Sequence, residues 1–248
     1  MRVLSAIALL LAVGGCGPAV RAPEPGGGSV VVFGAASLRT AFTEIAGRFE
    51  TDNPGAVVEF TFAGSADLLA QLTQGATADV LATADTATMD KAVRAGVASG
   101  TPVDFASNTL TIVVAPGNPR HVGSFADLAR PDLAVVVCAP QVPCGSATEK
   151  AEKAAGVRLS PASEESQVTD VLTKVTSGQA DAGIVYLTDA QAAGERVTTV
   201  TLPDSPVNRY PIAVVKDARN PALAKKFVEM VTGEAGQKIL AAAGFAKP

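Results

Sequence analysis

The chain has 248 residues, with 20 Lys or Arg against 24 Asp or Glu, so its formal net charge is −4. Hydrophobic residues make up 48% of the sequence and charged residues 18%, which is typical of a globular protein and excludes a wholly disordered chain. The sequence contains no run of basic residues, so it lacks the electrostatic feature on which binding to nucleic acid or anionic lipid depends. We therefore predict no nucleic-acid partner.

The N-terminus has the pattern of an export signal. Arg2 precedes an apolar stretch from Val3 to Val13, which is too short for a membrane-spanning helix of about 20 residues. Small residues then lead to Cys16, and this ending resembles the lipobox of bacterial lipoproteins. The resemblance implies a signal peptide over residues 1–15 and a lipid on Cys16. Ordinary cleavage that leaves Cys16 as a free thiol is the alternative.

Residues 16–29 are rich in proline and glycine and poor in apolar side chains, as in a spacer. We predict a flexible tether that links the lipid on Cys16 to a folded part beginning near Val30. No later apolar stretch approaches membrane-spanning length. The expected location is therefore extracytoplasmic, with the lipid anchor as the sole attachment to the membrane.

The first half of the folded part alternates short β-branched or aromatic runs with apolar residues at helical spacing. This pattern predicts strands and helices in turn, which favours a mostly parallel sheet with helices on both faces. The predicted elements are a strand at Val30–Phe33, a helix through Leu38–Phe49, a strand at Val57–Phe62, a helix through Leu68–Leu72, a strand at Asp79–Thr83 and a helix at Thr86–Ala95.

After a strand at Leu110–Ala115 and a turn at Pro116–Pro119, the alternation starts again. The second set comprises a strand at Leu133–Ala139, helices at Ala147–Ala155 and Val168–Val175, strands at Ala182–Tyr186, Val197–Leu202 and Ile212–Val215, and helices from Pro221 onward. Two sets predict an α/β protein of two lobes, one formed by residues 30–107 and 209–248 and the other by 108–208. A ligand cleft is expected between them at the carboxyl ends of the strands. A single α/β domain is the alternative.

Apart from Cys16, the cysteines are Cys138 and Cys144, six positions apart in a loop with two prolines. Export to an oxidising compartment favours a disulfide, but the sequence does not show whether their Cα atoms come within about 4.4–6.8 Å. Two free thiols remain the alternative. His121 is the one histidine and no Cys or His spacing completes a metal-ligand set, so neither a metal cofactor nor any other cofactor is expected.

Small and hydroxyl-bearing residues lie where predicted strands give way to helices, at Ser37, Ser65 and Cys144-Gly145-Ser146. The first N–H groups of a helix lack partners and lie at the positive end of its dipole, so several such ends facing one cleft would bind an anion. The alternative for each serine is an N-cap that serves its own helix.

Four segments occur in the order typical of one family: Val32-Phe-Gly-Ala-Ala-Ser37-Leu, Phe62-Ala-Gly-Ser65, Val142-Pro-Cys144-Gly and Gly183-Ile-Val-Tyr186-Leu-Thr-Asp189-Ala. Together they resemble the molybdate-binding proteins of ABC importers, and the likeness runs from about Val30 to Phe245. It implies a type II periplasmic-binding-protein fold that closes over a tetrahedral oxyanion and delivers it to a permease. The expected protein is a monomeric receptor for molybdate and tungstate, not an enzyme.

The resemblance also implies which groups bind the anion. Ser37 and Ser65 would donate through hydroxyl and backbone N–H, Cys144 and Val168 through backbone N–H, and Tyr186 through its hydroxyl. These neutral donors would hold molybdate by its oxygens, with no direct bond from protein to metal. Because only the N–H of Cys144 would bind, its side chain would be free to pair with Cys138.

Other functions fit the same residues less well. Sulfate would suit neutral donors as well as molybdate does, whereas hydrogen phosphate needs an acceptor that this set lacks. A hydrolase would need Cys144 or a serine beside His121 as base, but the sequence has no Gly-x-Ser-x-Gly and His121 lies in a polar turn. A ligand-sensing domain of a regulator is opposed by the export signal.

Overall fold

The computed structural model describes residues 27–248, so the predicted signal peptide, Cys16 and the tether up to residue 26 lie outside the described residues. The first strand, β1, spans Gly28–Ala35, and its residues Gly28 and Ser29 pair with Ala56 and Val57. The strand therefore begins two residues before Val30, the predicted start of the folded part, because backbone pairing needs no apolar side chain.

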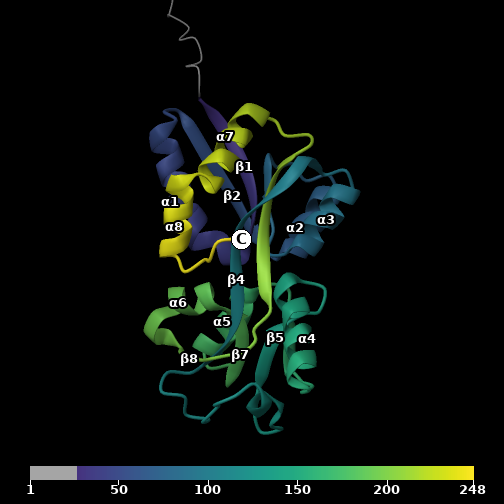
Figure 1. Ribbon diagram of the computed structural model, residues 1–248, viewed down its shortest axis with the longest axis vertical. Coiled ribbons are helices and arrows are strands. Elements are labelled where there is room, and N and C mark those ends of the chain that lie inside the picture. Colours follow the sequence, from purple (N-terminus) through teal and green to yellow (C-terminus); the bar gives the residue numbers. More distant parts are fainter. Residues whose placement is uncertain (1–26) are drawn as a thin grey trace, which may run out of the picture.

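The first lobe contains three parallel strands in the order β2-β1-β3. Helices α1, α7 and α8 pack together on one side of these strands, and α2 and α3 lie on the other (Figure 1). Its elements are β1, α1 (Arg39–Asp52), β2 (Ala56–Ala63), α2 (Ser65–Thr73), β3 (Val80–Ala82), α3 (Thr86–Arg94), α7 (Pro221–Thr232) and α8 (Glu234–Ala242).

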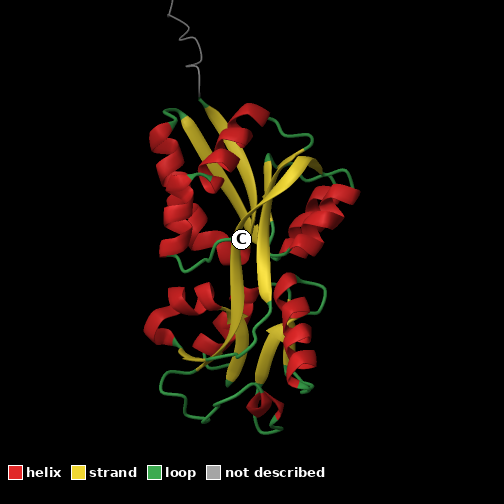
Figure 2. Ribbon diagram, viewed as in Figure 1, coloured by secondary structure: helices red, strands yellow, loops and turns green. Residues whose placement is uncertain are grey.

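The second lobe repeats this plan with the parallel order β6-β5-β7. Helices α5 and α6 cover one side and α4 the other, so in both lobes the strands lie between helices (Figure 2). Its elements are β5 (Val135–Cys138), α4 (Pro143–Ala155), β6 (Ser163–Glu165), α5 (Val168–Thr176), β7 (Ala182–Tyr186), α6 (Leu187–Ala193) and β8 (Thr198–Val200).

Two long strands, β4 (Ala98–Val114) and β9 (Val207–Val215), run antiparallel to each other and connect the lobes. β9 also pairs with β3, and β4 pairs with β7 and β8. The parallel sets predicted for each lobe are confirmed, and β4 and β9 join them into one mixed sheet of nine strands within residues 27–248.

The apolar runs of the strands are explained by burial on both faces. Along β1, Val30 and Val32 pack into the main core, whereas Phe33 faces a second cluster with Leu68 and Met89 beneath α2 and α3. A strand covered on both sides needs apolar side chains at consecutive positions, which is why β1 reads as a continuous run instead of an alternation.

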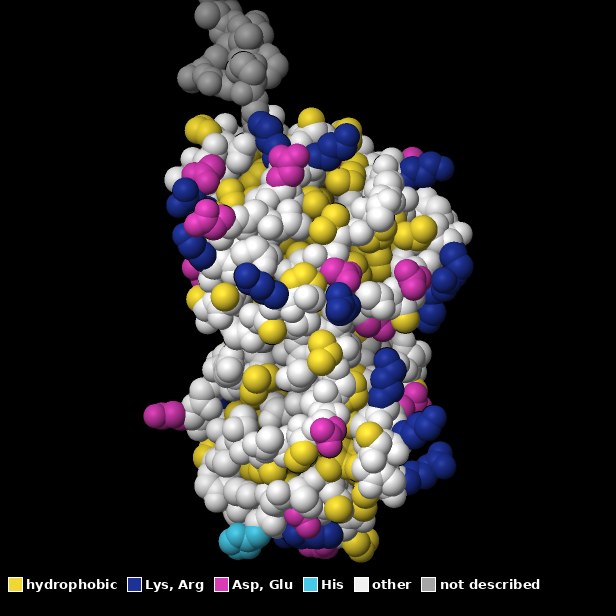
Figure 3. Space-filling model, viewed as in Figure 1, with side chains coloured by type: hydrophobic (Ala, Val, Ile, Leu, Met, Phe, Trp, Pro, Cys, Tyr) yellow, Lys and Arg dark blue, Asp and Glu magenta, His cyan; other side chains and the backbone are white. Residues whose placement is uncertain are grey.

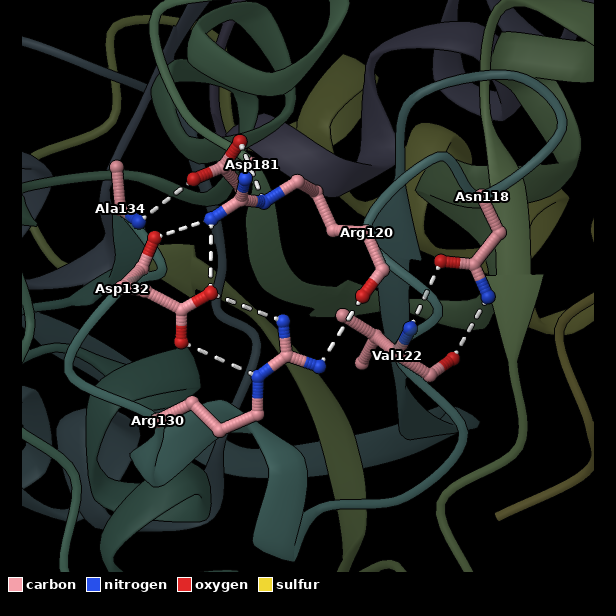
Figure 4. Close-up of polar contacts among 7 residues, drawn as sticks. All are labelled: Asn118, Arg120, Val122, Arg130, Asp132, Ala134 and Asp181. Carbon is pink, nitrogen blue, oxygen red and sulfur yellow. Dashed lines mark hydrogen bonds and ion pairs between the residues drawn. The ribbon is translucent and has the colours of Figure 1, made fainter.

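The loop between β4 and β5 is held by polar contacts at the end of the second lobe (Figure 4). Arg120 donates to the backbone and carboxylate of Asp132, and Arg130 pairs with the same carboxylate at 3.2 Å. The Arg130 hydrogen bond is the main reason that the pKa of Asp132 lies below its usual range. Asp181, just before β7, accepts from the backbone N–H of Ala134, so the loop is fastened to the sheet.

Positive and negative side chains occur over both lobes on the face shown in Figure 3, and neither sign forms a single large patch there. In residues 27–248, no cluster of three His, Cys, Asp or Glu side chains is arranged to hold a metal ion. Within the same residues, no helix has the length and apolar character needed to cross a membrane.

Candidate anion-binding site

All five residues predicted to bind the anion line one cavity, which lies between the lobes. The cavity has a volume of about 20 Å³, so a sugar or peptide cannot enter it while the walls are in this position. None of its lining residues is charged. They are Ala35, Ala36, Ser37, Gly64, Ser65, Ala84, Val142, Pro143, Cys144, Ser166, Gln167, Val168 and Tyr186.

The five predicted residues come from both lobes. Ser37 lies in a 3₁₀ turn after β1 and Ser65 is the first residue of α2, both in the first lobe. Cys144 and Val168 lie in the first turns of α4 and α5, and Tyr186 ends β7, all in the second lobe. The spatial convergence that the sequence could not show is therefore present in the fold.

Three helices, α2, α4 and α5, begin at the cavity, and none has a side-chain N-cap. By contrast, Asp85 caps α3 and Asn220 caps α7 with side-chain oxygens. The unoccupied N–H groups and the positive ends of three helix dipoles thus meet in a cavity without a cation, an arrangement that attracts an anion.

Two glycines allow the walls to approach closely. A Cβ on Gly64 would collide with the carbonyl oxygen of Ser166, on the opposite lobe, and a Cβ on Gly145 would collide with the carbonyl oxygen of Ala139. Both obstacles are backbone atoms, so a change of rotamer cannot relieve them. Gly64 permits the lobes to meet at the cavity, and Gly145 permits α4 to begin directly against the end of β5.

The serine hydroxyls serve no N-cap function for their own helices. Ser65 Oγ accepts from the backbone N–H of Ala84 at 3.0 Å, and Ser37 Oγ lies 3.1 Å from the hydroxyl of Tyr210. Because Ser65 receives a hydrogen from Ala84, its own hydroxyl hydrogen is available to another acceptor. The N-cap alternative is therefore wrong for both serines.

Tyr186 is buried, with 1% of its surface exposed, and its hydroxyl accepts from Asn208 Nδ2 at 2.8 Å. Burial raises the pKa of Tyr186 well above its ordinary value, with smaller contributions from Tyr210 and from the carboxylates of Asp85 and Asp189. The phenol therefore stays protonated at neutral pH and can donate to an anion.

Cys138 and Cys144 form a disulfide, with Cα atoms 5.6 Å apart, so the pairing that the sequence left open is settled. It joins the last residue of β5 to the first turn of α4. Cys144 therefore cannot act as the nucleophilic thiol of a hydrolase, because its sulfur is bonded to Cys138. His121 is exposed in the loop after β4 and does not line the cavity, so it is no base for a serine there.

Behind the cavity lies Asp189, on α6, with 6% of its surface exposed. Its Oδ2 has no hydrogen-bond partner among residues 27–248. Burial raises the pKa of this carboxyl to about 7, and the backbone N–H of Tyr186 opposes the shift. Asp189 also lines a neighbouring hollow, together with Arg39 and Arg196.

Sequence reasoning missed three residues around the site: Ala84, Asn208 and Tyr210. Ala84 lines the cavity, and the other two contact the hydroxyls of Tyr186 and Ser37 from β9. Nothing in the sequence indicates that β9 passes behind the cavity.

Comparison with known proteins shows which family shares this sequence. Residues 30–246 match the family described as bacterial extracellular solute-binding protein. The chain is 55% identical over 246 residues to the molybdate-binding protein ModA of Mycobacterium tuberculosis, covering 98% of this chain and 94% of the relative.

Two solved structures share the fold. The periplasmic molybdate-binding protein of Azotobacter vinelandii has a TM-score of 0.77 and 22% identity, covering 88% of this chain and 99% of that one. The sulfate-binding protein SubI of Mycobacterium tuberculosis has a TM-score of 0.80 and 22% identity, covering 88% and 86%. At this identity the likenesses show the two-lobed type II periplasmic-binding-protein fold alone. The chain belongs to the bacterial extracellular solute-binding proteins and, among them, to the molybdate-binding proteins.

Proposed function

We propose that this protein is an extracytoplasmic receptor that binds molybdate, and tungstate as its close chemical analogue, and delivers the anion to an ABC permease. The observation behind the proposal is an uncharged cavity where the N-termini of three helices meet the side chains of Ser37, Ser65 and Tyr186. The relatives that are 55% identical along nearly the whole chain are molybdate-binding proteins.

The proposed contacts are the hydroxyl and backbone N–H groups of Ser37 and Ser65, the backbone N–H groups of Cys144 and Val168, and the hydroxyl of Tyr186. Each hydrogen bond to a charged group contributes about 1.5–3 kcal/mol, so several donors together offset the cost of removing a dianion from water. Neutral donors also leave no unpaired charge when the cavity opens to release the anion.

Binding would involve closure of the two lobes, which we place at residues 30–107 with 209–248 and at residues 108–208. The two boundaries fall on neighbouring rungs of one ladder, since Ser107 pairs with Arg209 and Asn108 pairs with Asn208. A hinge at these rungs would let the lobes separate while β4 and β9 remain paired.

Lipid attachment to Cys16 would hold the receptor near its permease, where tethering raises the effective concentration of one partner for the other. A Cys16→Ala variant should then be released from the membrane fraction, and the mass of the wild-type N-terminal peptide should include the lipid. We also propose that the receptor acts as a monomer.

Thermal unfolding in the presence of four anions tests the proposal. Molybdate at about 100 times its dissociation constant should stabilise the folded state by about 2.7 kcal/mol, and tungstate should act similarly. Sulfate and phosphate at the same concentration should raise the melting temperature less. An unchanged melting temperature with molybdate would reject the proposal, and stabilisation by sulfate alone would favour a sulfate receptor.

A further inference from the structure

Asn208 connects the two walls of the cavity from behind. It lies in β9 with 6% of its surface exposed, and its side-chain nitrogen donates to the carbonyl oxygen of Ala84 at 3.0 Å and to the Tyr186 hydroxyl at 2.8 Å. The carbonyl oxygen of Pro143 lies 3.5 Å from the same nitrogen. Ala84 belongs to the first lobe, whereas Pro143 and Tyr186 belong to the second.

The directions of these hydrogen bonds follow from the atoms involved. A backbone carbonyl can only accept, so the side-chain atom of Asn208 that faces Ala84 must be the NH₂ group. One N–H of that group points to Ala84 and the other to Tyr186, so the phenol oxygen accepts from Asn208. The hydrogen of the Tyr186 hydroxyl is therefore left for another acceptor. This is either the Tyr210 hydroxyl, which contacts Tyr186 from β9, or an anion in the cavity that Tyr186 lines.

Ala84 extends the same chain of hydrogen bonds to the other wall. Its carbonyl oxygen accepts from Asn208, and its N–H donates to Ser65 Oγ at 3.0 Å. Ser65 and Tyr186 thus each receive one hydrogen from this chain, and each keeps its own hydroxyl hydrogen to donate. The N–H and the C=O of Ala84 belong to different peptide groups, so the chain links the two walls by fixing their positions.

We propose that Asn208 is a positioning residue of the anion site: it holds Tyr186 as an obligatory hydrogen donor and ties that donor to the Ala84 wall of the opposite lobe. The inference rests on the proposed function, because it assumes that the cavity binds an oxyanion. Asn208 does not line the cavity, so it acts through Tyr186 and Ala84 and not by contact with the ligand.

A double-mutant cycle separates this role from a general effect on folding. Molybdate affinity is measured by calorimetric titration for wild type, Asn208→Ala, Tyr186→Phe and the double variant. Each single change should weaken binding about tenfold, equivalent to about 1.4 kcal/mol. If Asn208 acts through the phenol, adding Asn208→Ala to Tyr186→Phe should lower molybdate affinity by less than a further factor of about three. A further tenfold loss in the double variant would overturn the proposal.

Thr111→Val is the matched control, because Thr111 is equally buried and loses one hydrogen bond, to Val200, outside the cavity. It should lower the melting temperature of the ligand-free protein, by less than Asn208→Ala because that variant loses two hydrogen bonds, and it should leave molybdate affinity unchanged. If Thr111→Val weakens binding as much as Asn208→Ala does, the effect is one of stability and the proposal fails.

If Asn208→Ala does not fold, Asn208→Asp can be tested in its place. The aspartate side chain has nearly the same shape as asparagine, but a carboxylate replaces the NH₂ donor. At pH 8 it should bind molybdate at least tenfold more weakly than wild type, because the carboxylate accepts the Tyr186 hydrogen. Wild-type affinity in this variant would refute the assignment. Failure of the wild-type protein itself to bind molybdate would instead refute the proposed function.

Discussion

The hydroxyl of Tyr210 lies 3.1 Å from Ser37 Oγ, although the two residues are 173 positions apart in the chain. Tyr210 is fully buried in β9, where its ring also packs edge-on against Phe245 and Tyr186. A strand from the C-terminal part of the chain thus supports a hydroxyl at the N-terminal part, at the wall of the proposed anion site.

Replacing Ser37 by alanine should weaken molybdate binding by about 1.5–3 kcal/mol without abolishing it, because the backbone N–H remains. Tyr210→Phe removes a hydroxyl that contacts Ser37 and Tyr186 but leaves both proposed donors in place, so a smaller loss of about 0.5–1.5 kcal/mol is expected. Calorimetric titration of both variants gives the two values. Equal affinity of wild type and Ser37→Ala would show that the serine hydroxyl does not bind the anion.

Gly64→Ala should impair closure of the lobes. The added Cβ collides with the Ser166 carbonyl oxygen across the cavity, so the lobes cannot meet as they do here. Molybdate affinity should fall by at least about tenfold. X-ray scattering should show the wild type contracting on addition of molybdate and the variant contracting less.

Gly47→Ala is the control for this substitution, since a Cβ on Gly47 in α1 meets no atom within 4 Å. It should leave binding unchanged and raise helix stability by about 0.5–1 kcal/mol. Full contraction and wild-type affinity in Gly64→Ala would contradict the assignment of Gly64 and Ser166 to walls that meet on closure.

The disulfide between Cys138 and Cys144 should contribute more to stability than to binding. Its sequence separation is 6, and closure of so short a loop contributes about 2 kcal/mol in the chain-entropy account. A Cys138→Ser, Cys144→Ser variant should lose about that much free energy of unfolding in a urea titration. Molybdate affinity should change little, because the proposed donor at position 144 is the backbone N–H.

Asp189 should make folding stability depend on pH. Its pKa of about 7 in the folded state lies above the ordinary value of 3.8, so between these values the folded protein holds a proton that the unfolded chain releases. The contribution of Asp189 is therefore most favourable below about pH 4 and is lost as pH rises to about 7. Each unit of pKa shift corresponds to about 1.4 kcal/mol.

Asp189→Asn isolates this effect, since an amide cannot titrate. Between pH 4 and pH 7, the free energy of unfolding of the wild type should fall relative to that of Asp189→Asn. Above pH 7 the difference between the two proteins should stay constant. Denaturant titrations at several pH values measure it. A difference that is independent of pH would show that the carboxyl does not titrate in this range.

The sequence predicted the elements whose burial leaves an apolar pattern, such as β1, β7 and α5. It missed β6, whose residues Ser163–Glu165 are polar, because that strand forms through backbone pairing with β5. It also missed the first part of β4, from Ala98, where glycine and proline interrupt the run and the ladder with β9 has register shifts. Pairing between distant segments leaves no local signal.

For the site, strand-to-helix junctions pointed to Ser37, Ser65 and Cys144, while the resemblance to a family supplied Val168 and Tyr186. Asn208 and Tyr210 could not be found in this way. They act from β9, and their approach to the cavity depends on the crossing of β4 and β9 between the lobes. The hydroxyls were predictable as donors, but the groups that orient them were not.

If the cavity between the lobes binds molybdate through neutral donors, calorimetric titration of the ligand-free protein should show one molybdate ion bound per chain. In a competition experiment, sulfate should displace that ion only in large excess. Saturable binding of sulfate with no heat from molybdate would contradict this assignment of the cavity.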